Sequence, residues 1–555
     1  MKISLTANGY SMHERLFKAR LSDRLSADFC DGGLEISFQV DALLGKPESY
    51  QITEKNGAWC VVGSDELGLY YGVGKLLHSA KWGKDSFAPV ATDGVVSAAC
   101  DFRAIYFAIH FYNWYQNAPI EELERYLEDL LLWGYNTIIC ILPIVNIDSF
   151  EDELFKASKA NVRRVFTIAK KFGMKSGIII DNNQGMRTAP HELDAEISFD
   201  LTFRGNAGRN LCISKPETVE YMRNIWTTSL EAFLDIGLDY VITWPYDEGG
   251  CGCEKCRPWG ANGYGNSVLM VGAEVKKYYP NAKLIVSTWA FDMPVSEGEY
   301  EGLYKRLTGD MAGVDYLMVD AHGEFPKYPL THDIIKPIIN FPEISMWGLG
   351  PWGGFGANPL CERFQRIWDS SKHVLSGGMP YSEGIYEDIL KVQCGCYYWH
   401  PDRHYRDIIA EYINYEYSAE VTDDVLEMIS YIEKNHTHVA EHEPPELDIA
   451  LRAAELAKSI DARLPEWAKT AWRWRILYIR AIVDGKRYRA YYEDGREELK
   501  KPLWVMYYSG DLLLDDAEAQ ELFHELWKHY HCVPHNGENH HTLPPYGGTK
   551  LEVVV

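Results

Sequence analysis

The chain has 555 residues, 46% of them hydrophobic and 13% aromatic, so it is long enough for two or three domains with sizeable cores. Its formal net charge of −25 argues against nucleic acid or an anionic membrane as a partner, because phosphate binding requires clustered lysine and arginine. No apolar run approaches the length of a membrane span, and residues 1–17 lack the apolar segment of a signal peptide. We therefore expect a soluble, cytoplasmic protein whose 12 cysteines serve as metal ligands or buried thiols and not as a disulfide scaffold.

Residues 1–98 are predicted to form a small α+β domain. Short apolar runs alternate with turn residues and are followed by the helical pattern LGLYYGVGKLLHSAKW. The stretch ESYQITEKNGAWCVVGSDELGLYYGVGKLLHSA resembles the N-terminal accessory domain that precedes the barrel in glycoside hydrolase family 20. This resemblance implies that a catalytic barrel follows.

From residue 99 to about 400, apolar strand-like runs alternate with amphipathic helical stretches, which is typical of βα units around a parallel sheet. Eight such units predict a (β/α)₈ TIM barrel, whose active site lies at the carboxyl ends of the strands. The eight strand candidates are residues 102–111, 137–144, 176–181, 240–247, 284–291, 316–321, 344–349 and 378–383.

Residues 401–555 carry helical patterns and no strand signal until the last few positions, so we expect an all-α C-terminal domain packed on the barrel. Its tail, HCVPHNGENHHTLPPYGG, is rich in histidine and proline and is predicted to be a loop or an ordered arm.

Two adjacent carboxylates, Asp247 and Glu248, end the fourth predicted strand. Glycoside hydrolysis needs an acid that protonates the leaving oxygen and a second group that stabilises the oxocarbenium-like centre. The Asp-Glu pair resembles the pair that closes strand four in family 20, which implies that Asp247 orients a 2-acetamido group and Glu248 is the acid and then the base. The first strand, DFRAIYFAIHF, resembles the family's first barrel strand, which implies that Arg103 grips the sugar.

Glu383, at the end of the eighth predicted strand, is a second catalytic candidate. It could act as a nucleophile or base, bind sugar hydroxyls, or only brace an aromatic residue. The order of accessory domain, barrel and helical domain also resembles α-glucuronidases and α-N-acetylglucosaminidases.

Further residues at the strand ends are predicted to bind the substrate, because polar and aromatic side chains on one barrel face suit a sugar ring. They are His110, Trp244, Tyr246, Trp289, Asp320, His322, Trp347, Trp352 and Tyr381.

Three cysteines follow the fourth strand with C-x-C-x-x-C spacing: Cys251, Cys253 and Cys256. They are one thiolate short of a tetrahedral zinc site, and Cys212, just before a predicted helix, is the candidate fourth ligand. The arrangement resembles glycoside hydrolase family 42, in which four thiolates hold a structural zinc. Free or disulfide-paired cysteines are the alternative.

These observations together predict an exo-acting β-N-acetylhexosaminidase with a substrate-assisted retaining mechanism, acting on a small oligosaccharide or glycoside. One alternative is a glycosidase for another sugar, such as a uronic acid, that uses Glu248 with Glu383. Another is a non-catalytic carbohydrate-binding barrel. The sequence leaves the formation of a homo-oligomer open.

Overall fold

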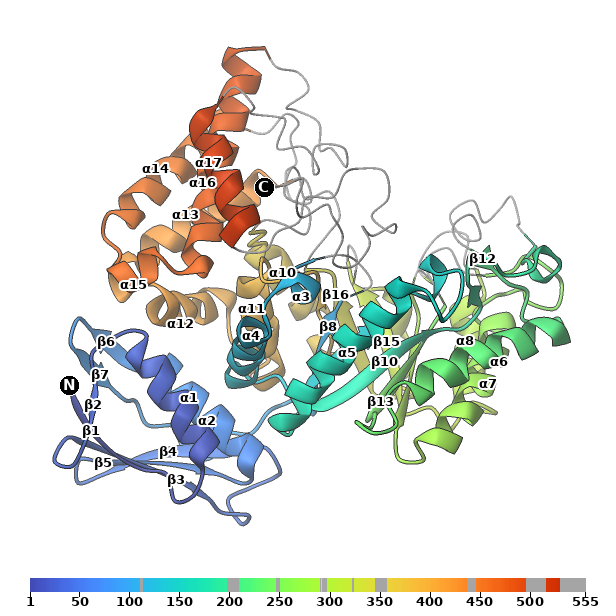
Figure 1. The fold of residues 1–555 in the computed structure, drawn as a ribbon, viewed down its shortest axis with the longest axis horizontal. Coiled ribbons are helices and arrows are strands. Elements are labelled where there is room, and N and C mark those ends of the chain that lie inside the picture. Colours follow the sequence, from blue (N-terminus) through green and yellow to red (C-terminus); the bar gives the residue numbers. More distant parts are fainter. Residues whose placement is uncertain are drawn as a thin grey trace.

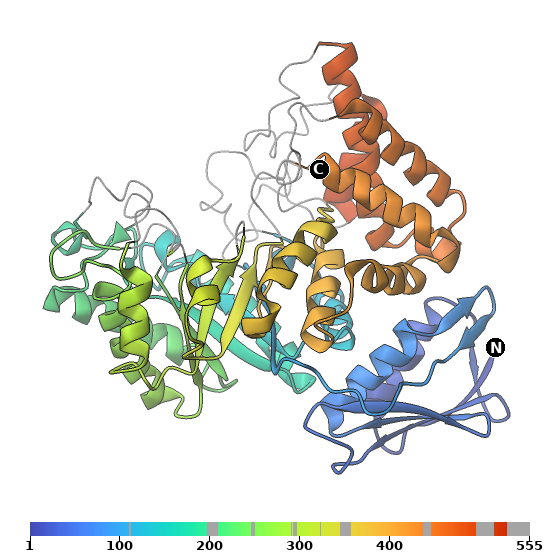
Figure 2. The same ribbon diagram turned by 180° about the vertical axis from the view of Figure 1, so that it is seen from behind.

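The structure is a computed structural model, and the residues it describes are 1–109, 113–196, 209–245, 250–289, 291, 297–321, 324–344, 357–436, 446–495 and 516–529. Its elements form three successive groups: an N-terminal sheet with helices, a barrel, and a C-terminal group of helices (Figure 1). In both views the N-terminal sheet and the C-terminal helices lie at the same end of the molecule, beside barrel helices α4 (Ile120–Leu132) and α11 (Asp388–Trp399) (Figures 1 and 2).

The N-terminal group is a five-stranded sheet covered by helices. Its elements are β1 (Lys2–Thr6), α1 (Ser11–Ser22), β2 (Asp28–Phe29), β3 (Leu34–Val40), β4 (Tyr50–Lys55), β5 (Ala58–Gly63), α2 (Glu66–His78), β6 (Lys81–Gly83) and β7 (Ser86–Ala88). The strand order is β2-β1-β3-β5-β4, and only β4 and β5 pair antiparallel. Asn56 and Gly57 join this hairpin with positive φ angles of 55° and 85°, as a two-residue turn of the asparagine-glycine type requires.

Helix α2 connects the sheet to the barrel. A Cβ atom on Gly74 would lie 2.1 Å from the carbonyl oxygen of Leu132, at the end of barrel helix α4 (Ile120–Leu132). The glycine-rich pattern of this helix therefore permits a close approach of two backbones.

Eight parallel strands form the barrel, as predicted. They are β8 (Phe102–Phe107), β9 (Thr137–Ile141), β10 (Lys175–Asp181), β13 (Tyr240–Trp244), β14 (Lys283–Ser287), β15 (Tyr316–Ala321), β16 (Ile338–Pro342) and β17 (Leu375–Gly378). The sheet closes because β17 pairs with the start of β8, and the short β18 (Tyr381–Ser382), which continues the eighth strand, pairs with its end. All residues of β8, β13 and β16 are buried, which is typical of a parallel sheet covered on both faces.

Helices cover the outside of the barrel. Besides α4 they are α3 (Trp114–Asn117), α5 (Glu153–Lys171), α6 (Pro216–Glu231), α7 (Gly263–Tyr278), α8 (Glu299–Leu307), α9 (Lys327–Thr331), α10 (Cys361–Ser371) and α11 (Asp388–Trp399). A small antiparallel pair, β11 (Gln184–Gly185) and β12 (Arg209–Asn210), follows the third barrel strand.

The seventh strand differs from the prediction of residues 344–349. It is β16, Ile338–Pro342, which follows Pro337 directly and ends at Pro342. Proline is unusual within a sheet because it has no N–H to donate, but here the two prolines stand just before the strand and at its last position, and the carbonyl of Pro337 accepts a hydrogen bond from Leu317.

The C-terminal group is helical in the part of the chain that the structure describes. Its helices are α12 (Tyr405–Glu416), α13 (Thr422–Lys434), α14 (Leu447–Asp461), α15 (Glu466–Lys469), α16 (Trp472–Glu493) and α17 (Ala517–His529). Among the described helices, none is both long and apolar enough to cross a lipid bilayer.

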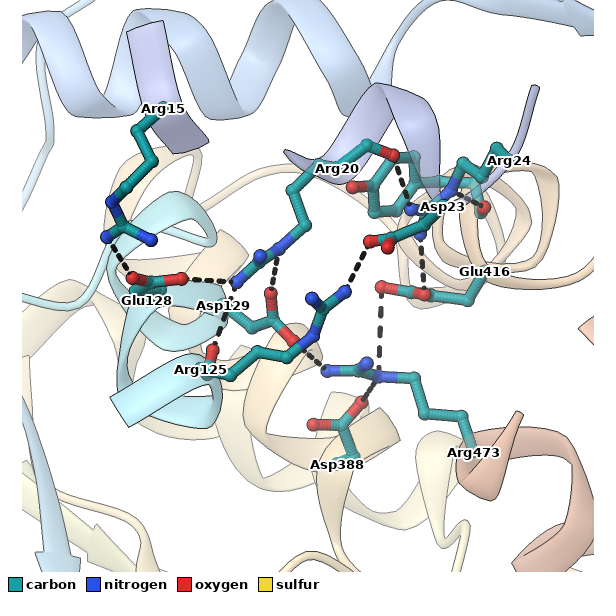
Figure 3. Close-up of polar contacts among 11 residues, drawn as sticks. Arg15, Arg20, Asp23, Arg24, Arg125, Glu128, Asp129, Asp388, Glu416 and Arg473 are labelled. Carbon is teal, nitrogen blue, oxygen red and sulfur yellow. Dashed lines mark hydrogen bonds and ion pairs between the residues drawn. The ribbon is translucent and has the colours of Figure 1, made fainter. Parts of the chain in front are cut away.

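A network of ion pairs joins the three groups (Figure 3). Arg20 of α1 contacts Glu128 and Asp129 of α4 at 2.9 and 2.7 Å. On the other side of Asp129, Arg473 of α16 contacts the same carboxylate at 3.0 Å and Asp388 of α11 at 2.7 Å. One buried cluster of charges therefore holds the N-terminal helix, the barrel and the C-terminal helices together.

Candidate active site

Five aromatic side chains form a layer inside the barrel near the carboxyl ends of its strands. They are Tyr106, Trp244, Trp289, Phe341 and Tyr381. The ring centroids of Trp244 lie 5.3 Å from those of both Trp289 and Phe341, and Tyr381 lies 5.4 Å from Tyr106. All five are buried, so they form the floor of the barrel mouth. Three predicted substrate-binding residues, Trp244, Trp289 and Tyr381, are thus brought together.

Glu383 lies at the edge of this layer, one residue beyond β18, and its side chain is buried. The hydroxyl of Tyr381 donates a hydrogen bond of 2.6 Å to its Oε1 atom. Burial raises the pKa of Glu383 to about 8, the hydrogen bond from Tyr381 opposes this rise, and the nearby charge of Glu387 adds to it. At neutral pH Glu383 therefore carries a proton, and it can donate this proton to an oxygen atom bound above the aromatic layer.

Glu343 is an acid that the sequence analysis did not select. It follows the last residue of β16 directly, is buried, and pairs through its backbone with Tyr381. Its charge contributes to the raised pKa of Tyr381, after the larger effects of burial, Glu383 and Tyr106. The signal in the sequence was an acid directly after the short apolar run IINFP. It was overlooked because the seventh strand was predicted at residues 344–349, beyond this acid.

Arg103 occupies the opposite end of the barrel. It is the second residue of β8, it is 1% exposed, and its guanidinium donates hydrogen bonds to the carbonyls of Gly134 and Cys100 and to the carboxylate of Glu48. Burial opposes its charge, but Tyr71 and Glu48 outweigh this effect and raise its pKa. Its neighbours Phe102 and Ala104 face the barrel interior, so Arg103 lies on the outer face of the strand, away from the aromatic layer, and these contacts do not support the prediction that it grips the sugar.

The other predicted site residues cannot be placed. Asp247, Glu248, His110, Tyr246, His322, Trp347 and Trp352 lie outside the described residues, and only the backbone of Asp320, in β15, is described. Strand β13, which leads into Asp247 and Glu248, ends at Trp244 in the aromatic layer.

The four predicted cysteine ligands come together beside the barrel. The sulfur atoms of Cys212, Cys251, Cys253 and Cys256 all lie within 4.8 Å of one another, and none forms a disulfide. Cys212 precedes α6 and the other three precede α7, so the cluster ties together the segments that lead into two neighbouring helices. Glu196 strengthens this connection, since its carbonyl accepts a hydrogen bond of 2.7 Å from the backbone N–H of Gly252.

The donor set of this cluster fits a metal ion such as zinc. Hydrogen bonds among these thiols lower the pKa of Cys212 and raise the pKa values of Cys251 and Cys256, so the three groups share their protons as one cluster. Four thiolates would repel one another without a cation, and they complete the tetrahedral shell of a structural zinc without leaving a position for water.

Neither a protein-family model nor a curated protein sequence matches the chain. Solved structures do share its fold. The family 89 glycoside hydrolase of Clostridium perfringens, in complex with its substrate GlcNAc-α-1,4-galactose, is 13% identical; the match covers 98% of this chain and 73% of that chain, with a TM-score of 0.61.

A family 115 4-O-methyl-α-glucuronidase with specificity for decorated arabinogalactans is 12% identical, over 99% of this chain and 79% of its own, at a TM-score of 0.56. A family 20 β-N-acetylglucosaminidase is 13% identical, over 74% of this chain and 92% of its own, at 0.50. At these identities the likeness shows the fold, and the chain has the fold of these glycoside hydrolases.

Proposed function

We propose that the protein is a glycoside hydrolase that removes a terminal sugar, with its active site at the carboxyl ends of the barrel strands. The observation that carries the proposal is Glu383, a buried carboxyl group with a pKa of about 8 beside an aromatic layer. A protonated acid next to flat rings suits a reaction in which a sugar ring is held and its leaving oxygen is protonated.

Glu383 works in this proposal with a carboxylate from the fourth strand. Glu248 and Asp247 follow β13, and the fourth strand of an eight-stranded barrel stands across from the eighth. Because Glu383 bears the proton at neutral pH, Glu248 becomes the ionised partner that stabilises the oxocarbenium-like centre. A separation of about 5–5.5 Å between the two carboxyl groups would mean direct nucleophilic attack, and roughly 6.5–9.5 Å would mean inversion through a water molecule.

The first substrate class we propose is a terminal N-acetylhexosamine. Of the proteins of similar fold, the family 89 enzyme has GlcNAc-α-1,4-galactose as its substrate, and the family 20 protein is a β-N-acetylglucosaminidase. The substrate-assisted mechanism predicted from the sequence is the alternative to this assignment of roles: in it Asp247 orients the acetamido group and Glu248, not Glu383, is the acid. A uronic acid is the second candidate, because the match to the family 115 glucuronidase covers 99% of this chain.

A panel of aryl glycosides tests the proposal. We expect turnover of an N-acetylhexosaminide or a glucuronide, and a loss of about 10²–10⁴-fold in kcat for Glu383→Gln and for Glu248→Gln with the fold intact. Inhibition by a thiazoline-type compound would favour acetamido assistance. Binding of sugars without any turnover would instead make the protein a carbohydrate-binding barrel and reject the enzyme.

We also propose that the four-cysteine cluster holds a structural zinc ion that fixes the segment after the fourth strand. Metal analysis of the purified protein is expected to give about one zinc per chain, and Cys253→Ser to lose it. Cys361→Ser, which changes a buried cysteine elsewhere, is the matched control and should keep the metal. Zinc retained in the Cys253 variant would reject the site.

A further inference from the structure

A buried ion pair lies behind Glu383, and the proposed reaction does not use it. The ammonium of Lys391, in α11, lies 3.4 Å from the Oε2 atom of Glu387, and neither side chain is exposed. Burying two charges costs free energy that their attraction alone seldom repays. The position of the pair, four to eight residues beyond Glu383, suggests what offsets this cost.

Lys391 holds the backbone that follows Glu383. Its ammonium donates hydrogen bonds to the carbonyl of Gly384 and to the hydroxyls of Tyr126 and Tyr115, at 2.7 and 3.1 Å for the two hydroxyls. The carbonyl of Gly384 also accepts a hydrogen bond of 2.9 Å from Tyr115. The residue next to Glu383 is therefore fixed from two helices, α3 and α11.

The residue before Glu383 is fixed by the same group of side chains. The hydroxyl of Ser382 lies 2.6 Å from that of Tyr115 and 3.3 Å from the Oε2 atom of Glu387. Both neighbours of Glu383 in the chain thus contact the cluster formed by Tyr115, Glu387 and Lys391. The side chain of Glu383 leaves this cluster on the other side, toward Tyr381.

The start of α11 is itself anchored to the C-terminal helices. Asp388, the residue after Glu387, contacts Arg473 of α16 at 2.7 Å (Figure 3) and accepts a hydrogen bond of 2.8 Å from the hydroxyl of Tyr412 in α12. The cluster behind Glu383 is therefore a rigid support, because each of its charges has a fixed partner.

Glu387 also acts on Glu383 through its charge. Burial is the larger cause of the raised pKa of Glu383, and the charge of Glu387 raises it further. Burial lowers the pKa of Lys391, the partner of Glu387, and the charges of Glu387 and Asp388 oppose this fall. The other titratable and charged groups near Glu383 come from several elements. The barrel strands provide Tyr381 and Glu343 at their carboxyl ends. The helices provide Tyr115 on α3, Tyr126 on α4, Glu387, Asp388 and Lys391 at α11, and Arg473 on α16.

We propose that Glu387 and Lys391 are a positioning pair for Glu383: Lys391 holds the carbonyl of Gly384 on one side of it, Glu387 holds the hydroxyl of Ser382 on the other, and the anion of Glu387 opposes a second negative charge at Glu383. The inference rests on the proposed function, in which Glu383 is the catalytic acid. The pair does not touch the substrate, and it keeps Glu383 in place and in the form that donates a proton.

The pH dependence of kcat/KM in four variants tests the pair. In Glu387→Gln the activity is expected to fall at a slightly lower pH than in the unchanged protein, by a fraction of a unit, because the charge of Glu387 is the smallest of the three effects on the pKa of Glu383. Lys391→Met leaves Glu387 without its counter-ion, so Glu387 takes up a proton and the fall moves in the same direction. The double variant is expected to move it no further, because both changes remove the same charge.

Glu411→Gln is the matched control. Glu411 is another nearly buried carboxylate, paired with Lys75 at 2.8 Å and with Arg403, and it lies next to the N-terminal sheet. This variant is expected to lower the melting temperature without moving the pH dependence. If Glu387→Gln, like the control, leaves the pH at which kcat/KM falls unchanged, the pair is only structural and the inference is overturned. The inference is also overturned if the double variant shifts this pH by the sum of the two single shifts.

A second measurement keeps this test independent of the enzyme proposal. Carbon NMR of labelled glutamate carboxyls, with Glu383→Gln to identify the signal, reports the titration of Glu383 without any substrate. We expect a midpoint near pH 8 that falls in Glu387→Gln. If the midpoint shifts but the protein has no glycosidase activity, the proposed function is wrong and the role of the pair stands. If the midpoint is the same in Glu387→Gln as in the unchanged protein, the role of the pair is wrong.

Discussion

The two ends of the barrel each bury a charged residue, and the two residues differ in how they are satisfied. At the amino end the guanidinium of Arg103 has three hydrogen-bond acceptors, including the carboxylate of Glu48, and its pKa is raised in favour of the charged form. At the carboxyl end Glu383 accepts one hydrogen bond from Tyr381, and its pKa is raised in favour of the neutral form. Both are buried, but only Glu383 has a proton to give at neutral pH.

The comparison teaches that burial does not by itself mark a functional residue. A buried charge that its neighbours fully compensate makes the fold sensitive to loss of either partner, whereas an acid that its surroundings keep neutral is suited to catalysis. Mutations at the two ends are therefore expected to separate stability from rate.

The largest effect on stability is expected from Arg103→Met. The change keeps the length of the side chain but leaves Glu48 beside the barrel without its cation, although Asn136 still donates a hydrogen bond of 3.0 Å to Glu48. We expect the free energy of unfolding to fall by about 3–5 kcal/mol, measured by urea denaturation, with KM unchanged. Glu383→Gln, the control at the other end, should lose rate and keep stability. A large loss of kcat in an Arg103 variant that remains stable would instead show that Arg103 takes part in the reaction.

The sequence was sufficient to predict the barrel and the cysteine cluster. Alternating strand and helix patterns indicate the barrel, and the spacing of Cys251, Cys253 and Cys256 is local, so the three ligands could be recognised without tertiary information. The NG turn between β4 and β5 is another local signal.

The roles of individual side chains depended on information that the sequence did not contain. Arg103 belongs to a barrel strand and Glu383 directly follows one, but the end of the barrel at which each lies depends on where the strand starts and stops. Glu343 was missed for the same reason, since the seventh strand was predicted at residues 344–349 and Glu343 directly follows the strand observed at 338–342. The contacts of Lys391 with Tyr115 and Tyr126 join residues 276 and 265 positions apart, so no local pattern could predict them.

The next effect is a pH dependence of stability that only the carboxyl end should show. The native pKa of Glu383 is about 8, above its ordinary value of 4.5, so between these values the folded protein binds more protons at this group than the unfolded protein does. The contribution of Glu383 is therefore fully present below pH 4.5 and is lost as the pH rises through 8.

This loss can be measured by comparing Glu383→Gln with the unchanged protein. The side chain of the glutamine variant does not titrate, so the variant keeps its stability at this position as the pH rises. Between pH 5 and pH 8.5 the free energy of unfolding of the unchanged protein should therefore fall by a few kcal/mol relative to that of the variant. A parallel pH dependence in the two proteins would contradict the raised pKa.

The smallest effect is expected from Tyr381→Phe. The hydroxyl of Tyr381 donates to Glu383 at 2.6 Å and lowers its pKa, so its removal should raise that pKa further and move the fall in activity to higher pH by a fraction of a unit. Tyr240→Phe removes a hydroxyl from the other end of the barrel interior and should leave this pH unchanged. If both variants shift it equally, the effect belongs to the packing of the barrel interior as a whole. If only Tyr381→Phe shifts it, the hydrogen bond is what sets the acid at the carboxyl end apart from the charge at the amino end.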